Sequence, residues 1–96
     1  QQNYRIAVEP QGNSCLALFR VEGLNYRAIQ SVTIEQIFPA GSGQSNTSES
    51  LSAPPFEVFS ASGSHSATVR ATIQFHNGQS RTLTLQHAPP PGPCML

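Results

Sequence analysis

Residues 65–87 constrain the fold more than any other stretch, because they specify both a pair of strands and the register between them. Residues 65–75 and 79–86 alternate apolar and polar side chains, which is the period of a half-buried β-strand. Between them lies His76-Asn77-Gly78, a sequence typical of a β-hairpin loop. We therefore predict an antiparallel strand pair in this part of the chain.

The length of the hairpin loop decides which side chains share a face. A two-residue Asn-Gly turn would place Val69 opposite Gln86 and so pair apolar side chains with polar ones. A three-residue loop, with Gly78 in a left-handed bulge, pairs apolar side chains on one buried face. We predict this loop, whose register pairs Val69 with Leu85 and Ala71 with Leu83.

Five further segments have the composition of short strands, and turn residues separate them. They are residues 1–9, 14–22, 29–38, 44–51 and 56–59. The first ends at Pro10, which indicates an edge strand. Adjacent Ile37 and Phe38 in the third predict a bulge or a change of buried face.

Residues 40–52 are polar and rich in Gly and Ser, so two interpretations stay open for them. The composition is typical of a flexible linker, but a poorly hydrophobic edge strand over residues 44–51 fits equally well. Asn46-Thr47-Ser48 also matches an N-glycosylation acceptor, which would have no meaning in a bacterial protein.

Together the segments predict an all-β fold, an immunoglobulin-like β-sandwich of about seven antiparallel strands. With 96 residues, one domain can bury roughly two-thirds of the surface of its unfolded chain. We assign the sandwich to residues 1–88 and a proline-rich tail to residues 89–96. The sequence has no Trp, so the central tryptophan of antibody domains is missing.

Charge and hydropathy disfavour several classes of partner. Charged residues make up 10% of the chain, against about 25% in an average domain, and five Arg balance five Glu. This argues against nucleic acid and against an anionic membrane surface. No apolar run approaches the roughly 20 residues that span a bilayer, so we expect no membrane insertion. Because the sequence begins at Gln1 rather than Met, we expect an exported protein without its signal peptide, although a truncated chain would look the same.

The two cysteines, Cys15 and Cys94, are too far apart for a CxxC redox pair and too few for a metal cage. We predict a structural disulfide between them, formed in an oxidising compartment. The alternative is a buried thiol at Cys15 and a free thiol in the tail.

The sequence offers no arrangement typical of catalysis, so we expect a protein that is not an enzyme and uses no cofactor. Its serines do not lie in a Gly-x-Ser-x-Gly elbow, its five glutamates are scattered singly, and it has no Asp. A weak surface metal site at His65 and His87 would need a further ligand, so we expect His65, His76 and His87 to be ordinary solvated side chains and predict no metal site.

Three arginines are the candidate contact residues: Arg5, Arg20 and Arg70. Each lies in the outward phase of a strand whose inward phase is apolar. A guanidinium on a rigid sheet presents five fixed donors, which suits polar, amide-rich or acidic partners. The alternative is that these arginines only keep a sheet face soluble and protect it from edge-to-edge aggregation.

Two segments resemble a known family. Residues 41–47, Gly-Ser-Gly-Gln-Ser-Asn-Thr, follow the third strand, and residues 77–80, Asn-Gly-Gln-Ser, precede residues 83–86 and Pro89-Pro90. In their order and separation they resemble the CsgC-like family of periplasmic inhibitors of curli amyloid, and within it the CsgH subgroup. The Cys-x-Cys pair of some members is replaced here by Ala28 and Gln30, so no redox role carries over.

The resemblance implies a small monomeric sandwich in the periplasm that keeps a curlin-type amyloid subunit from nucleating cross-β fibres. The implied mechanism is a transient, electrostatically assisted encounter with the unfolded, Gln/Asn-rich subunit. Two other functions compete with it: an immunoglobulin-like adhesion or structural module of an exported protein, and a thiol oxidoreductase, which would require a reactive cysteine of low pKa.

Overall fold

The computed structural model describes residues 4–10, 17–23, 26–59 and 66–88 of the chain. Their order is β1 (Tyr4–Pro10), β2 (Ala17–Gly23), the 3-10 turn η1 (Tyr26–Ala28), β3 (Ile29–Ile37), β4 (Thr47–Leu51), β5 (Glu57–Phe59), β6 (Ala67–Phe75) and β7 (Ser80–His87). No helix among these residues has the length and apolar character needed to cross a bilayer.

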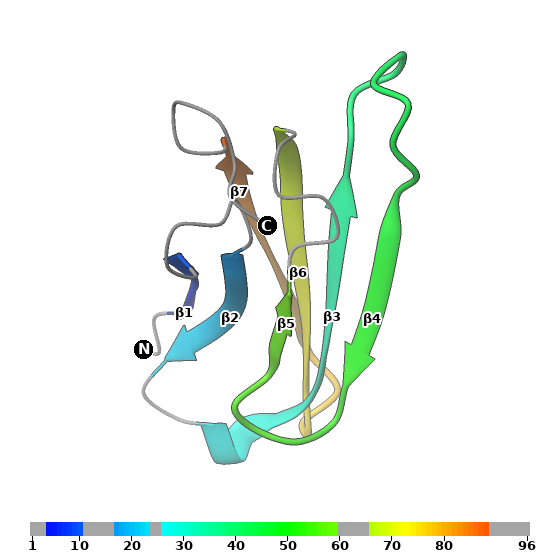
Figure 1. The fold of residues 1–96 in the computed structure, drawn as a ribbon. Helices are drawn as coiled ribbons and strands as arrows, with labels where there is room; N and C mark the ends of the chain where they lie inside the picture. Colours follow the sequence, from blue (N-terminus) through cyan, green and yellow to red (C-terminus); the bar gives the residue numbers. More distant parts are fainter. Residues whose placement is uncertain (1–3, 11–16, 24–25, 60–65, 89–96) are drawn as a thin grey trace.

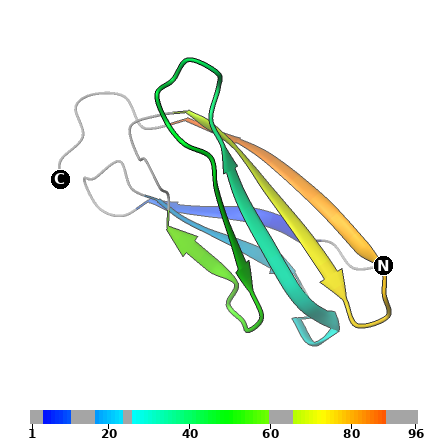
Figure 2. The same cartoon turned by 90° about the vertical axis from the view of Figure 1, so that its right-hand side faces the viewer.

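The strands form two antiparallel sheets that pack face to face (Figures 1 and 2). One sheet has the order β1-β2-β5 and the other β4-β3-β6-β7. This arrangement confirms the predicted immunoglobulin-like sandwich of about seven strands. It also resolves the two interpretations of the polar segment, because Thr47–Leu51 is an edge strand.

The core lies between the sheets and is built from the inward phase of the central strands. Phe19 and Val21 of β2 are fully buried, as are Val32 of β3 and Val69 of β6. The period-two pattern of apolar residues that predicted these strands therefore matches the pattern of buried side chains. Burying each of these side chains stabilises the fold by roughly 1.5–3 kcal/mol.

The hairpin between β6 and β7 has the predicted register. Val69 pairs with Leu85 and Ala71 with Leu83, and both leucines pack against the core. Gly78 has a φ of 89°, and its N–H donates to the carbonyl of Phe75 at 3.0 Å. The left-handed residue that closes this loop is therefore a glycine, which adopts that conformation at no steric cost.

The predicted bulge or change of buried face at Ile37 and Phe38 is wrong. Buried side chains recur at Val32, Ile34, Gln36 and Phe38, so the phase stays constant and Ile37 simply belongs to the opposite face. The irregularity in β3 lies between Ile29 and Ser31 instead, where the register against β6 shifts.

Candidate functional site

A cluster of five charged side chains covers the outer face of the three-stranded sheet. Arg5 lies opposite Glu22 across the β1–β2 pair, and Arg20 lies opposite Glu57 across the β2–β5 pair. These four residues and Glu9 share the outward phase of their strands. Two guanidinium groups thus meet three carboxylates, and the cluster carries a formal charge of −1.

Arg20 is the centre of this charged cluster. Its Nη1 donates to Glu9 Oε1 at 2.6 Å, its Nε donates to Glu22 Oε2 at 3.1 Å, and its Nη1 lies 3.7 Å from Glu57 Oε2. The hydrogen bonds that Arg20 donates to Glu9 and Glu22 raise its pKa. This side chain is only 26% exposed and contacts carboxylates from three strands, so its main role is to hold the three strands of the sheet together.

Arg5 occupies the rim of the same cluster. Its Nε and Nη2 both donate to Glu22 Oε1, at 3.0 and 2.7 Å, and its side chain is 78% exposed. The hydrogen bond from Arg5, followed by that from Arg20, lowers the pKa of Glu22. The guanidinium is therefore fixed in place and still open to a partner.

Arg70 lies on the outer face of the other sheet. It forms a bidentate salt bridge with Glu35, in which Nε donates to Oε1 at 2.8 Å and Nη2 donates to Oε2 at 3.1 Å. This pair lowers the pKa of Glu35 and raises that of Arg70. The fold thus brings Arg5 and Arg20 together and places Arg70 on the opposite side of the sandwich.

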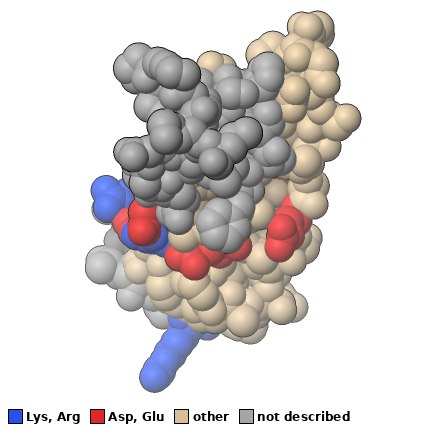
Figure 3. Space-filling model, in the orientation of Figure 1, with Lys and Arg blue, Asp and Glu red and all other residues tan. Residues whose placement is uncertain are grey.

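Hydroxyl and amide side chains surround the Arg70–Glu35 pair. Thr33 and Thr72 face outward on neighbouring strands, next to Thr82, and Thr68 Oγ1 donates to Gln86 Oε1 at 3.1 Å. This outer face is thus polar but almost uncharged. In the space-filling view, basic and acidic side chains meet at the left of the molecule, whereas a separate acidic area lies at the right and a basic side chain projects alone at the bottom (Figure 3).

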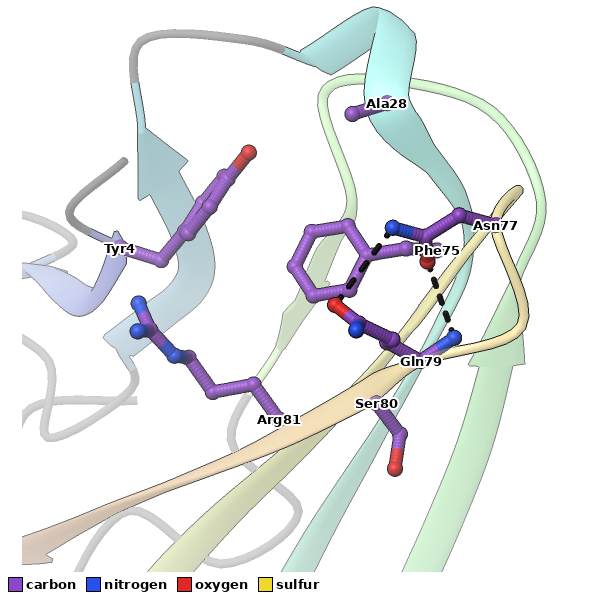
Figure 4. A pocket seen from close by; sticks show the side chains of 7 residues that line it. All are labelled: Tyr4, Ala28, Phe75, Asn77, Gln79, Ser80 and Arg81. Atoms are coloured by element: carbon purple, nitrogen blue, oxygen red, sulfur yellow. Dashed lines mark hydrogen bonds between the residues drawn. The ribbon is translucent and has the colours of Figure 1, made fainter. Parts of the chain in front are cut away.

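A surface pocket of about 360 Å³ opens where β1 of one sheet approaches the β6–β7 hairpin of the other. The rings of Tyr4 and Phe75 lie 5.5 Å apart at an angle of 56°, and Arg81 extends toward Tyr4 (Figure 4). At the loop, Asn77 Oδ1 accepts the N–H of Gln79 at 2.9 Å. The described residues that line the pocket include no pair of groups set for acid–base or nucleophilic chemistry.

The described histidines do not converge. His87 packs edge-on against Phe19, with ring centroids 5.1 Å apart, and its buried Nε2 has no hydrogen-bond partner among the described residues. Burial lowers the pKa of His87, so the expectation of an ordinary solvated histidine is wrong at this position. His76 lies exposed in the hairpin loop. Within the described ranges, no three His, Cys, Asp or Glu side chains gather as metal ligands would. His65, Cys15, Cys94 and the tail lie outside the described residues.

The carboxylate partners of the arginines could not be identified from the sequence. Glu22 is 17 positions from Arg5 and Glu35 is 35 positions from Arg70, and only the strand pairing brings them together. The available signal was the phase, because Glu22 and Glu35 share the outward phase of their strands with these arginines.

By fold and surface the protein is a small immunoglobulin-like sandwich whose two outer faces carry ion-paired arginines. Comparison of the chain with protein-family models, with curated proteins and with solved structures finds no match.

Proposed function

We propose that this protein is a non-enzymatic binding module that delays the nucleation of cross-β fibrils by a curlin-type subunit in the periplasm. The observation that carries the proposal is a guanidinium that is both fixed and accessible: Arg5, held by Glu22 and 78% exposed. The all-β sandwich agrees with the fold that the resemblance to the CsgC-like family implies.

The chemistry of the contact follows from the free donors of the fixed arginines. Arg5 uses Nε and Nη2 to bond Glu22, and its Nη1 has no described partner. Nη1 can therefore donate to a side-chain amide or a main-chain carbonyl of another chain. Arg70, 45% exposed, offers a second such group amid hydroxyl and amide side chains. An unfolded, Gln/Asn-rich chain presents acceptors of this kind at almost every residue.

A weak contact of this type can still suppress a fibril. Cross-β growth requires strands to template one another, so a protein that binds the earliest associating chains acts below stoichiometric amounts. Exposed charges influence the rate of encounter more than the affinity, and salt screens them within about 8–10 Å. We therefore expect a transient encounter whose strength decreases with ionic strength.

The test is the thioflavin fluorescence of a purified curlin subunit at a tenth-molar amount of this protein. The lag before fibril growth should lengthen, and an unchanged lag would refute the proposal. Replacing Arg5→Gln, and separately Arg70→Gln, should shorten the lag toward that of the subunit alone. Arg27→Gln is the matched control, since Arg27 is exposed on η1 and its loss changes the net charge equally.

Arg20 needs a separate test. Arg20→Gln removes the cation between three carboxylates, so loss of inhibition in this variant would not distinguish a contact role from a weakened sheet. If Arg5→Gln and Arg70→Gln both inhibit like wild type, the arginines only solubilise their faces.

A further inference from the structure

The strands that the structure describes include four edge strands, and these differ in how open they are to another chain. The edges formed by β1 and β7 lie beside each other. β5 is only three residues long and follows Pro54-Pro55. β4, by contrast, has five residues without proline and forms the outer margin of its sheet, facing the reader in Figure 2.

β4 therefore carries an unused row of backbone donors and acceptors. Among the described residues it pairs only with β3, from Val32–Leu51 to Gln36–Thr47. Thr47, Ser48, Glu49 and Ser50 are exposed, while Leu51 packs against the core. Thr33 Oγ1 and Ser50 Oγ share a hydrogen bond at 3.1 Å, which fixes one side of the strand. An edge of this kind is a template for an added strand.

Glu49 limits what can be added. It pairs with the buried Ile34 and so has the inward phase, yet it is exposed, because the facing sheet ends at β5. Inward-pointing charges on edge strands oppose edge-to-edge association. In a symmetric antiparallel pairing of two copies over the whole of β4, Thr47 would face Leu51 and Glu49 would face Glu49. Like charges directly opposite each other destabilise such a pair.

We propose that the free edge of β4 binds an extended, amide- and hydroxyl-rich segment of a partner protein as a fifth strand of the sheet. Glu49 favours a segment with a basic or amide side chain opposite it and rejects an acidic segment or a second copy. This inference rests on the proposed function, since it names where the unfolded, Gln/Asn-rich partner adds. The short hydroxyl side chains of β4 match a polar segment and offer no apolar groove.

The test uses two synthetic peptides of about ten Gln, Asn and Ser residues that differ only in a central Lys or Glu. Amide resonances of β4 and β3 should shift when the Lys peptide is added to the ¹⁵N-labelled protein. The Lys peptide should bind roughly two- to fivefold more tightly than the Glu peptide, and Glu49→Lys should reverse this preference. Gln74→Lys, which adds a charge to the exposed outer face of β6, should leave the preference unchanged.

Other outcomes separate this inference from the proposed function. If the protein delays fibril growth but the peptide shifts map to the outer face of β1 and β2, the edge inference is overturned and the proposed function stands. If the shifts map to β4 but growth is not delayed, the edge inference stands alone. Sedimentation should show a monomer, and a dimer joined through β4 would overturn the inference.

Discussion

The substitution Gly23→Ala is expected to dislodge the Tyr4 ring and to destabilise the protein through that displacement. Gly23 lies directly opposite Tyr4 in the β1–β2 register. A Cβ at Gly23 would overlap Cδ1 and Cε1 of the ring and lie 3.1 Å from Cγ. Because three ring atoms are involved, no small torsion of the side chain can relieve the overlap, and the ring must leave its position.

The cost follows from what the ring contacts. Tyr4 is only 9% exposed and belongs to the core cluster, and its ring packs against Phe75 at 5.5 Å. Moving it out forfeits most of an aromatic burial of roughly 1.5–3 kcal/mol and a ring pair of roughly 0.5–1.5 kcal/mol. We expect Gly23→Ala to lower the free energy of unfolding by about 2–4 kcal/mol. For a domain of this size, that is a fall in Tm of roughly 8 °C or more.

A double-mutant cycle tests this reasoning by urea unfolding. In a Tyr4→Ala background there is no ring to displace, so Gly23→Ala should cost almost nothing or stabilise slightly, as alanine does relative to glycine in a strand. Gly41→Ala is the control: Gly41 has a φ of 85° and open space around it, so its cost should be the same in both backgrounds. An equal cost of Gly23→Ala with and without Tyr4 would refute the explanation.

Two further predictions concern the hairpin and its pH dependence. Gly78→Ala should destabilise by about 1–2 kcal/mol in thermal unfolding, because the φ of 89° strains any side chain while the space itself is open; no loss would refute the left-handed loop. Since burial lowers the pKa of His87 in the folded state, the unfolded chain binds its proton first, and stability should fall as the pH drops below about 6.5. His87→Leu should flatten the fall between pH 7 and 5.5 in urea unfolding, above the range where Glu22 and Glu35 titrate; an unchanged slope would contradict the role of His87.

The hairpin register could be predicted because one physical rule decides it. The side-chain period of a strand is two, so only an odd loop keeps Leu83 and Leu85 on the same face as Val69 and Ala71. The edge position of β1 could be predicted for a similar reason, since Pro10 cannot donate to a central ladder.

Two adjacent apolar residues, Ile37 and Phe38, do not by themselves mark a bulge in β3. Phe38 keeps the inward phase of Val32, and Ile37 has the outward phase that the alternation of a regular strand gives it. The useful clue was the spacing of three between Ile29 and Val32, both buried, which a regular strand cannot place on one face.

For the candidate site, the outward phase of Arg5, Arg20 and Arg70 could be predicted, but not their grouping. Phase says which face of its own sheet a side chain takes, whereas sheet membership depends on how strands distant in sequence pair. Arg70 lies on β6, which pairs with β3 and β7, so it cannot join the cluster on β1 and β2.

Most of the charged side chains of this protein form ion pairs with one another. All ten charged side chains lie in the described residues, and seven of them form the two ion-paired groups on the outer faces. Only Arg27, Glu49 and Arg81 lie outside those groups. Because these charges are paired and balance overall, the field of the whole molecule is weak, and any electrostatic attraction of a partner comes from individual exposed groups such as Arg5 acting over a short range.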